Sequence, residues 1–512
     1  MSESPNTGEV PGIRPGEPHD ERLLERVRPP GWENPRPADR YDLLVVGGGT
    51  AGLVSAAIGA ALGARVALVE ARLLGGDCLN WGCVPSKALL AVARVAATAR
   101  GAQRLEVSTG EVAVDFAEAM RRMRRLRAEI SVHDSADRFR EMGVDVFLGR
   151  GQFVGREQLE VDGVPLAFRR AVIATGARPA EPPIEGLAEA GYRTSETVFE
   201  LASLPSRLAV VGGGPIGCEL AQAFARFGAE VVLLEAADRI LTSDDPDAAE
   251  VVADALRADG VDLRTDWPAE RIESTGEGPK RLVGGSGDPR ETLEVDEILV
   301  AVGRTPNVDG LGLDAAGVAF DAASGVRVDD RLRTTNRRIY AAGDVVPGPR
   351  FTHLSDAQAR IAVRNALFPW RQKADSIAVP WCTYTDPELA HVGHTRASAA
   401  EAGVEVDTFT RPSTEVDRAI LEGETGGFAR IHVKRGSDEI VGGTIVGPHA
   451  GETISEVTLA IERGIGLGGL SEVIHPYPTR AEALRAVADR YRRTRLTPFA
   501  KRVIGWWLKL AR

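Results

Sequence analysis

An α/β fold with two Rossmann-like domains and an α+β C-terminal domain is predicted by three features of the 512-residue sequence. The first is a short apolar strand, 42–46, that runs into a glycine-rich turn, an alanine-rich helix and a second strand, 65–70. The second is a repeat of this pattern over 208–235. The third is a change after about residue 379 to strand-rich and then helical sequence. Repeated β-α-β units build doubly wound parallel sheets, whereas segregated strands and helices build an α+β domain.

The N-terminal segment 1–40 contains eight prolines and few apolar residues. Such a segment buries too little apolar surface to offset its ordering entropy. We therefore expect a mostly disordered arm, with at most a short helix over 20–28.

The first glycine-rich turn is Gly47-Gly-Gly49-Thr-Ala-Gly52, and Glu70 ends the next strand. In a dinucleotide site the first glycine permits the tight turn, the second lets the pyrophosphate approach the backbone, and the helix N-terminus faces the phosphates. The acid then accepts hydrogen bonds from a ribose. A glycine motif alone also occurs in structural turns, so the strand before it and the acid after it are what indicate a dinucleotide site.

The second turn has the same spacing, with Gly212, Gly214 and Gly217 followed by Glu235. A carboxylate about 4 Å from a 2′-phosphate would cost roughly 4 kcal/mol at an effective dielectric near 20. Glu235 therefore favours NAD(H) over NADP(H), and Arg239 is the only basic residue nearby. Two such sites in one chain predict that a bound flavin dinucleotide exchanges electrons with a nicotinamide.

Further elements connect and follow these units. A long helical stretch, about 115–142, and a strand, 171–175, lie between them, and strands at 297–302 and 339–342 follow. The predicted domains are therefore an FAD-binding domain in two parts, an NAD(P)-binding domain and a dimerisation domain with a basic, aromatic tail. Their ranges are 41–195 with 319–375, then 196–318, and finally 376–512.

Composition excludes several classes of protein. The net charge of −11 argues against a nucleic-acid binder, which would carry a basic stripe. The sequence contains no run of 18 apolar residues, so we expect no membrane span. Its N-terminus lacks the charged and apolar regions of a secretory signal. Four cysteines are too few for a disulfide scaffold, so we expect a cytoplasmic protein.

Two of these cysteines, Cys78 and Cys83, lie in GGDCLNWGCVPSK, residues 75–87. Their spacing allows a small disulfide ring, and Pro85 suits the first turn of a helix that begins near Cys83. A helix N-terminus lowers a thiol pKa, and Lys87 adds positive charge on the same face. The pair therefore indicates a redox switch. The alternative, half of a zinc site, needs two more ligands, and no second pair at metal spacing is present, so we predict no metal site.

Residues 41 to about 490 resemble the FAD-dependent pyridine nucleotide–disulfide oxidoreductases, which include dihydrolipoamide dehydrogenase, glutathione reductase and mercuric reductase. The matching stretches are GGGTAG (47–52), GGDCLNWGCVPSK (75–87), ATGARP (174–179), GGGPIGCE (212–219), VGRTPN (302–307), YAAGD (340–344) and HPYPTRAE (475–482).

This resemblance implies roles for the matching positions. Cys83 would lie against the flavin as a thiolate, and Cys78 would exchange with the acceptor. Glu219 would lie near the flavin ring, paired with Lys87. The positions implied in FAD binding are Gly47, Gly49, Gly52, Glu70, Gly76, Lys87, Thr175, Gly176 and Asp344, and those in NAD binding are Gly212, Gly214, Gly217, Glu235 and Gly303. The resemblance also implies a homodimer in which the C-terminal domain of one subunit completes the active site of the other.

The last motif departs from the pattern of the dithiol-oxidising members. They carry a histidine five residues before a glutamate, but Tyr477 stands five residues before Glu482, and His475 is two residues earlier. At pH 7 a histidine of pKa about 6.5 is mostly a free base, whereas a tyrosine of pKa about 10 is anionic only about once in a thousand, a difference in available base of roughly 4 kcal/mol. We therefore expect electron flow from NADH to an acceptor. Two alternatives are that His475 reaches the same place and that Tyr477 is structural.

The predicted reaction passes electrons from NADH through FAD and the Cys78–Cys83 pair to a disulfide or a thiol-reactive metal ion. A tyrosine at position 477 resembles the mercuric reductases. The chain ends in GWWLKLAR without their cysteine pair, however, and Pro215 stands where those enzymes have a tyrosine. The alternatives are dihydrolipoamide oxidation and a redox-sensing or membrane-docked flavoprotein module.

Two features lie outside this pattern. The tail Thr497–Arg512 alternates apolar and basic residues, which is typical of an interfacial helix on an anionic membrane or of a cap on the dimer. Cys218 and Cys382 are single thiols, and single thiols are usually small buried hydrophobes.

Overall fold

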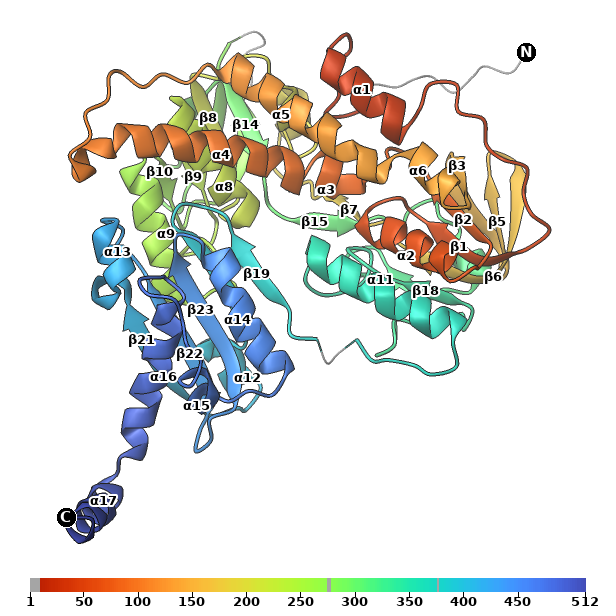
Figure 1. The fold of residues 1–512 in the computed structure, drawn as a ribbon. Helices are drawn as coiled ribbons and strands as arrows, with labels where there is room; N and C mark the ends of the chain where they lie inside the picture. The colour runs from red at the N-terminus through yellow and green to blue at the C-terminus, as the bar shows by residue number, and fades with distance from the viewer. Residues whose placement is uncertain (1–9, 274–277, 375–376) are drawn as a thin grey trace.

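The computed structural model of the chain describes residues 10–273, 278–374 and 377–512. Figure 1 shows two α/β domains and a C-terminal α+β domain, which confirms the predicted fold class. The first domain is built on a seven-stranded sheet in the order β3-β2-β1-β6-β5-β4, with β18 pairing on β6. Its strands are β1 (Tyr41–Val46), β2 (Val66–Glu70), β3 (Val144–Leu148), β4 (Gly151–Gly155), β5 (Gln158–Val161), β6 (Val164–Ile173) and β18 (Ile339–Ala341).

Strand β1 occupies the centre of this sheet and is buried on both faces. Leu43 and Val45 belong to one core cluster, whereas Leu44 and Val46 belong to another on the opposite side. A near-continuous apolar strand is expected where helices and loops cover both faces of a parallel sheet. The helices of this domain are α2 (Thr50–Ala61), α3 (Gly76–Asn80), α4 (Cys83–Arg100), α5 (Phe116–Ile130), α6 (Ala136–Glu141), α10 (Leu313–Ala316) and α11 (Thr352–Leu367). Helix α11 returns late in the chain to pack beside α2 (Figure 1).

The second domain repeats the arrangement on a smaller scale. A four-stranded parallel sheet has the order β10-β9-β8-β14, and a three-stranded antiparallel sheet, β11-β12-β13, adjoins it. The strands are β8 (Arg207–Val211), β9 (Glu230–Leu234), β10 (Asp262–Arg264), β11 (Ala269–Glu273), β12 (Lys280–Gly284), β13 (Glu291–Val295) and β14 (Glu297–Val300). The helices are α7 (Leu187–Ala190), α8 (Pro215–Phe227) and α9 (Pro246–Ala258). The short ribbon of β7 (Ala177–Pro179) and β15 (Arg304–Pro306) joins the two domains, and β16 (Phe320–Asp321) pairs with β17 (Gly325–Val326).

The third domain is a five-stranded antiparallel sheet in the order β19-β20-β23-β22-β21. Helices α14 and α16 pack on it (Figure 1). Its strands are β19 (Pro380–Thr383), β20 (Glu388–Gly393), β21 (Val406–Pro412), β22 (Phe428–Lys434) and β23 (Ile440–Gly447). Its helices are α12 (Arg396–Glu401), α13 (Asp417–Leu421), α14 (Ala450–Glu462), α15 (Leu467–Leu470), α16 (Glu482–Arg495) and α17 (Pro498–Leu510).

The predicted disordered arm is wrong for residues 10–40, while residues 1–9 lie outside the described residues. Helix α1 (Pro18–Val27) packs on α5, and its Leu23 and Val27 are fully buried. Asp20 is also fully buried and pairs with Arg127 of α5 at 2.6 Å. Proline content suggested disorder, but Leu23 and Val27 recur at helical spacing and find a tertiary partner that local composition does not reveal.

Two helical predictions are also refined. The single helix expected over 115–142 is two helices, α5 and α6, separated by a 3-10 turn at Ser131–Asp134. Within the described residues, one stretch, Gly76–Arg100, is long and apolar enough to cross a membrane. It comprises α3 and α4, and α4 packs on α5 and α8, although only 33% of its most apolar window is buried.

Candidate active site

The first glycine-rich turn joins β1 to α2, and the chain passes through it too tightly for any side chain. A Cβ on Gly52 would lie 1.7 Å from the carbonyl oxygen of Gly47. Gly47 itself has φ +107, and its Cβ would lie 2.3 Å from the carbonyl oxygen of Ala174. These contacts explain why two of the predicted glycines are required for the turn itself, and they direct the N-terminus of α2 toward the carboxyl ends of the parallel strands.

Glu70 lies at the end of β2 and closes this turn. Its carboxylate accepts hydrogen bonds from the backbone N–H groups of Gly48 and Arg72, each at 2.5 Å. Burial raises the pKa of Glu70, and these two donors oppose that rise. The carboxylate is therefore oriented by the backbone at the position where a ribose of a dinucleotide is expected.

The second turn has nearly the same geometry as the first. A Cβ on Gly217 would lie 1.9 Å from the carbonyl oxygen of Gly212, which has φ +112. Glu235, at the end of β9, accepts hydrogen bonds from the N–H groups of Gly213 at 2.7 Å and Ala237 at 2.8 Å. The repeat seen in the sequence is thus a repeat of geometry.

A cavity of about 480 Å³ opens above the second turn. Three of the predicted NAD-site glycines, Gly212, Gly214 and Gly303, line it together with Glu235. Gly217 does not line it, because it packs against the turn from behind. The remaining lining residues include Ser195, Leu234, Thr242, Trp267, Val302 and Arg304.

The predicted FAD-site residues converge from three separate parts of the chain. A Cβ on Gly76, at the start of α3, would lie 2.6 Å from the Cα of Gly49, so the cysteine-bearing segment packs directly on the first turn. Thr175 donates through its hydroxyl to the carbonyl of Asn307 at 2.7 Å, and the carbonyl of Gly176 accepts from the N–H of Asn307 at 2.9 Å. Gly176 has φ +68 and open space where a Cβ would stand.

Asp344, another of the predicted FAD-site residues, follows β18. Burial raises the pKa of Asp344, although the charge of Arg304 opposes this rise. Arg304 lies 3.8 Å from Asp344 and 2.9 Å from Asp77, which neighbours Cys78. The glycine turn, the oriented Glu70 and the half-buried Asp344 together form a donor and acceptor set that fits a flavin dinucleotide.

The cysteine pair lies where α3 gives way to α4. Cys83 is the first residue of α4, and Pro85 stands in the first turn, as the sequence predicts. Both cysteines are free thiols joined by a hydrogen bond between their sulfur atoms. The Cys83 Sγ also lies 3.5 Å from the hydroxyl of Thr352 at the start of α11.

This pairing separates the acidities of the two thiols. The hydrogen bond from Cys78 lowers the pKa of Cys83 to about 6, and the Lys87 ammonium also lowers it, against the effect of burial. The hydrogen bond to Cys83 raises the pKa of Cys78, and burial raises it further. The reduced pair therefore holds one thiolate, on Cys83, and one thiol, on Cys78.

Lys87 connects the pair to the second domain. Its Nζ lies 2.7 Å from Oε2 of Glu219 on α8, and Glu219 is buried. Burial opposes the charged form of the lysine, but Glu219 and Cys83 raise the pKa of Lys87. The pair implied by the resemblance is therefore present in the structure.

Three residues around the pair were not singled out from the sequence. Thr352 contacts Cys83, and Arg304 bridges the Cys78 loop to Asp344. Tyr384 donates its backbone N–H to Glu219 at 2.9 Å and places its ring 4.8 Å from the Lys87 ammonium. Arg304 lies inside the VGRTPN motif, so the sequence could have indicated it. No motif contains Thr352 or Tyr384, which lie near the pair only because of the fold.

The hydrogen bonds given for His475 and Tyr477 lie within the C-terminal domain. The Nε2 of His475 lies 2.9 Å from Oε1 of Glu456, and the histidine is buried. The hydroxyl of Tyr477 is exposed and donates to Asp417 at 2.8 Å. That hydrogen bond raises the pKa of Tyr477, as do the charges of Asp417 and Glu482, the first residue of α16.

The two single cysteines have separate environments. Cys218 on α8 is fully buried, and its thiol donates to the carbonyl of Gly213 at 3.3 Å, as expected for a small core residue. Cys382 on β19 is half-buried, and burial raises its pKa.

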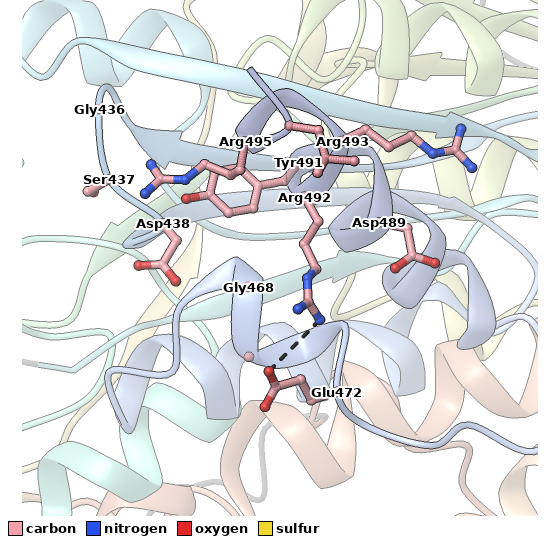
Figure 2. Close-up of a pocket in the computed structure, with 12 residues that line it drawn as sticks. Gly436, Ser437, Asp438, Gly468, Glu472, Asp489, Tyr491, Arg492, Arg493 and Arg495 are labelled. Atoms are coloured by element: carbon pink, nitrogen blue, oxygen red, sulfur yellow. Dashed lines mark ion pairs between the residues drawn. The ribbon is translucent and has the colours of Figure 1, made fainter. Parts of the chain in front are cut away.

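The cavity of about 880 Å³ shown in Figure 2 lies far from this chemistry in the fold, at the end of α16. In it, Arg492 extends toward Glu472, 3.8 Å away, whereas Arg493 and Arg495 extend in other directions. None of the predicted site residues lines it, so we do not assign it to the active site.

Comparison with known proteins places the chain in a family. Residues 41–359 match the profile of Pyridine nucleotide-disulphide oxidoreductase, and residues 379–488 match the dimerisation domain of these enzymes. A mercuric reductase of Lysinibacillus sphaericus is 37% identical over 450 residues, which cover 88% of this chain and 82% of that protein. A dihydrolipoyl dehydrogenase of Staphylococcus aureus is 34% identical over 455 residues, which cover 88% of this chain and 96% of that protein.

A solved structure agrees with these matches. The HOCl-induced flavoprotein disulfide reductase RclA from Escherichia coli superposes with a TM-score of 0.77 at 31% identity, over 88% of this chain and 99% of that chain. The chain therefore belongs to the pyridine nucleotide–disulphide oxidoreductase family. It is an oxidoreductase of a family that uses FAD and NAD(P), and it carries a dimerisation domain.

Proposed function

We propose that this enzyme passes electrons from NADH, through bound FAD and the Cys78–Cys83 pair, to a disulfide or a thiol-reactive metal ion. The observation that carries the proposal is the hydrogen-bonded thiol pair at the N-terminus of α4, beside the Lys87–Glu219 ion pair. When bound, FAD supplies hydride acceptance from the nicotinamide and delivery of the electron pair to sulfur.

The preference for NADH is supported by two side chains at the second turn. Both oxygens of Glu235 are held by backbone N–H groups, so the carboxylate cannot swing away from a ribose phosphate. Arg239 donates to the carbonyls of Leu241 at 2.9 Å and Thr242 at 2.8 Å. Arg239 is thus engaged with the backbone rather than available to a 2′-phosphate. Arg304, the basic residue that lines the cavity, is paired with Asp77 at 2.9 Å.

The sulfur chemistry follows from the divided acidities of the pair. Cys78 transfers its proton across the shared hydrogen bond to Cys83 and, as a thiolate, attacks one sulfur of an acceptor disulfide. A Cys78–acceptor bond forms and the other acceptor sulfur leaves as a thiolate. Cys83, after losing its proton, attacks the Cys78 sulfur, closes the Cys78–Cys83 disulfide and releases the second acceptor thiolate.

Two electrons leave the cysteine pair in this exchange, and two acceptor thiols form once protons are taken up. NADH supplies the electron pair that opens the disulfide again. Tyr477 can supply a proton to a leaving thiolate, because its hydroxyl is exposed and its raised pKa keeps that hydroxyl protonated at neutral pH. We propose that Tyr477 acts on the cysteines of the partner subunit in a homodimer. We also propose that the enzyme works in a reducing, cytoplasmic compartment.

The test is an acceptor screen with the FAD-loaded enzyme. NADH and NADPH are each offered with lipoamide, glutathione disulfide, Hg(II) and quinones, and turnover is followed as nicotinamide oxidation. We expect NADH to be preferred and Cys83→Ser to abolish turnover with the true acceptor. A Cys218→Ser variant serves as the matched control, because Cys218 is buried away from the pair. Full acceptor turnover by Cys83→Ser would refute the proposal.

Dihydrolipoamide oxidation is the second candidate, because relatives of that name match the chain at similar identity. It would require a base, and the His475–Glu456 contact provides a histidine next to a carboxylate. That histidine is buried in its own domain, which disfavours direct contact with a dithiol. Rapid NAD-linked oxidation of dihydrolipoamide, lost in His475→Ala, would favour this function over the first.

A further inference from the structure

The last helix, α17, has a strongly two-sided arrangement of side chains. Thr497 caps it by accepting the N–H of Ala500 at 3.1 Å, and Pro498 occupies its first turn. Phe499, Val503, Trp506 and Leu510 recur at intervals of three and four residues and form one stripe, which Trp507, Ile504 and Leu508 widen. Lys501, Arg502 and Lys509 fall on the opposite side, and Arg512 follows the helix.

The charge of this end of the chain is opposite to that of the whole. Between Arg490 and Arg512 there are eight basic residues and no acidic one, although the chain carries a net charge of −11. Arg493 and Arg495 lie at the end of α16, just before α17. The segment that contains the end of α16 and all of α17 therefore carries basic side chains and no acidic one.

Within the described residues, nothing covers the apolar side of α17. None of its residues is buried, and Phe499, Trp506 and Trp507 are exposed by 69%, 64% and 61%. Figure 1 shows it extending beyond the C-terminal domain at the end of the molecule. An apolar stripe of this size that stays in water indicates a surface meant for a partner.

We propose that α17 binds the surface of an anionic lipid bilayer and lies in the plane of the interface. Its 13 residues make a helix about 20 Å long, too short to cross a hydrocarbon core of about 30 Å. Tryptophan is favoured at the boundary between headgroups and acyl chains, and lysine and arginine on the other face meet anionic headgroups. The basic polar face and the tryptophans of the apolar face together match an anionic lipid surface, and a cap on a second copy of the chain is the alternative that the deletion below tests. The dimerisation domain would present two such helices, which raises the apparent affinity.

The test uses the full-length, FAD-loaded enzyme and vesicle flotation. Phosphatidylcholine vesicles that contain phosphatidylglycerol should carry the enzyme, whereas pure phosphatidylcholine vesicles should bind it at least about tenfold more weakly. Binding should fall in about 1 M salt, where the Debye length is about 3 Å. The tryptophan emission should shift to shorter wavelength on binding.

Matched variants separate the apolar and charged contributions. Trp506→Ser with Trp507→Ser should abolish flotation, whereas Trp370→Ser, which removes another tryptophan exposed by 61%, should not. Lys501→Gln with Arg502→Gln and Lys509→Gln should weaken binding by about tenfold or more. Arg121→Gln with Arg125→Gln and Arg281→Gln removes three exposed charges elsewhere and should leave it unchanged.

The molar mass measured by light scattering tests the alternative that α17 is a cap between subunits. Deletion of 497–512 should remove vesicle binding and leave both the dimer and NADH oxidation unchanged. A full-length enzyme that fails to float with anionic vesicles overturns the proposal. So does a deletion that dissociates the dimer, because α17 would then be a cap between subunits.

Discussion

Three features of the structure make the thiol of Cys83 more acidic than an ordinary cysteine thiol. The helix start places its sulfur at the N-terminus of α4, Cys78 donates a hydrogen bond to it, and Lys87 supplies a cation one helical turn later. Each of these favours the thiolate over the thiol. A sulfur so activated is available for exchange at pH values where an ordinary cysteine is protonated.

The contribution of the ammonium can be measured from alkylation of the reduced, FAD-loaded enzyme by iodoacetamide. The rate at Cys83, identified by peptide mapping, should rise with pH and reach half its maximum near pH 6, because the thiolate forms above its lowered pKa. In Lys87→Met the half-maximum should move upward, toward the ordinary cysteine value of about 8.5. Glu219→Gln keeps the ammonium and should leave the profile at low pH. An unshifted profile in Lys87→Met would show that the lysine has no part in the acidity of Cys83.

Helices α1 and α5 show how elements outside the active site hold it in place. Arg127 of α5 is fully buried and donates to the carbonyl of Asn80 in α3 at 2.7 Å and to that of Gly12 at 2.9 Å. The same guanidinium pairs with Asp20 of α1. Through Arg127, the N-terminal segment is therefore connected to α3, the helix that carries Cys78.

Removal of one partner from this buried pair should be costly. Asp20→Ala leaves the Arg127 charge buried without a counter-ion and should lower the free energy of unfolding of the first domain by about 3–5 kcal/mol. The measurement is chemical denaturation of the FAD-loaded protein. Glu118→Ala, which breaks an exposed pair with Arg121 on the same helix α5, should change it by no more than about 1 kcal/mol. Equal effects of the two variants would mean that the Asp20 pair is not structurally important.

At the scale of the whole molecule, the dimer that we propose would combine the cysteines of one subunit with Tyr477 of the other. Within one chain, Tyr477 contacts Asp417 of its own C-terminal domain, and the cysteines contact Thr352 and Lys87. A symmetric dimer brings a surface of one subunit to the corresponding partner surface twice, so two equivalent composite sites result.

Subunit complementation tests this division. Cys83→Ser and Tyr477→Phe subunits, carrying different affinity tags, are co-expressed and the mixed dimer is isolated. One of its two sites should combine an intact cysteine pair with an intact tyrosine, so acceptor turnover should return to about half that of the wild type. Each parental homodimer, measured alongside, should be impaired. No recovery in the mixed dimer would place the cysteines and Tyr477 of a site in the same subunit.

The sequence alone was sufficient where chemistry is written in local spacing. The two glycine turns, with Glu70 and Glu235 at the strand ends, and the cysteine pair before Pro85 are all local patterns. In such patterns the backbone path dictates which residues fit. The fold class and the family followed from these short segments.

Only the tertiary structure decided what depends on contacts between distant segments. It ordered residues 10–40 through the pairing of Asp20 with Arg127, brought Thr352, Arg304 and Tyr384 to the cysteine site, and buried His475 against Glu456 while leaving Tyr477 exposed. Burial and charge pairing of this kind are set by packing across the molecule, because a residue's neighbours in space are not its neighbours in sequence.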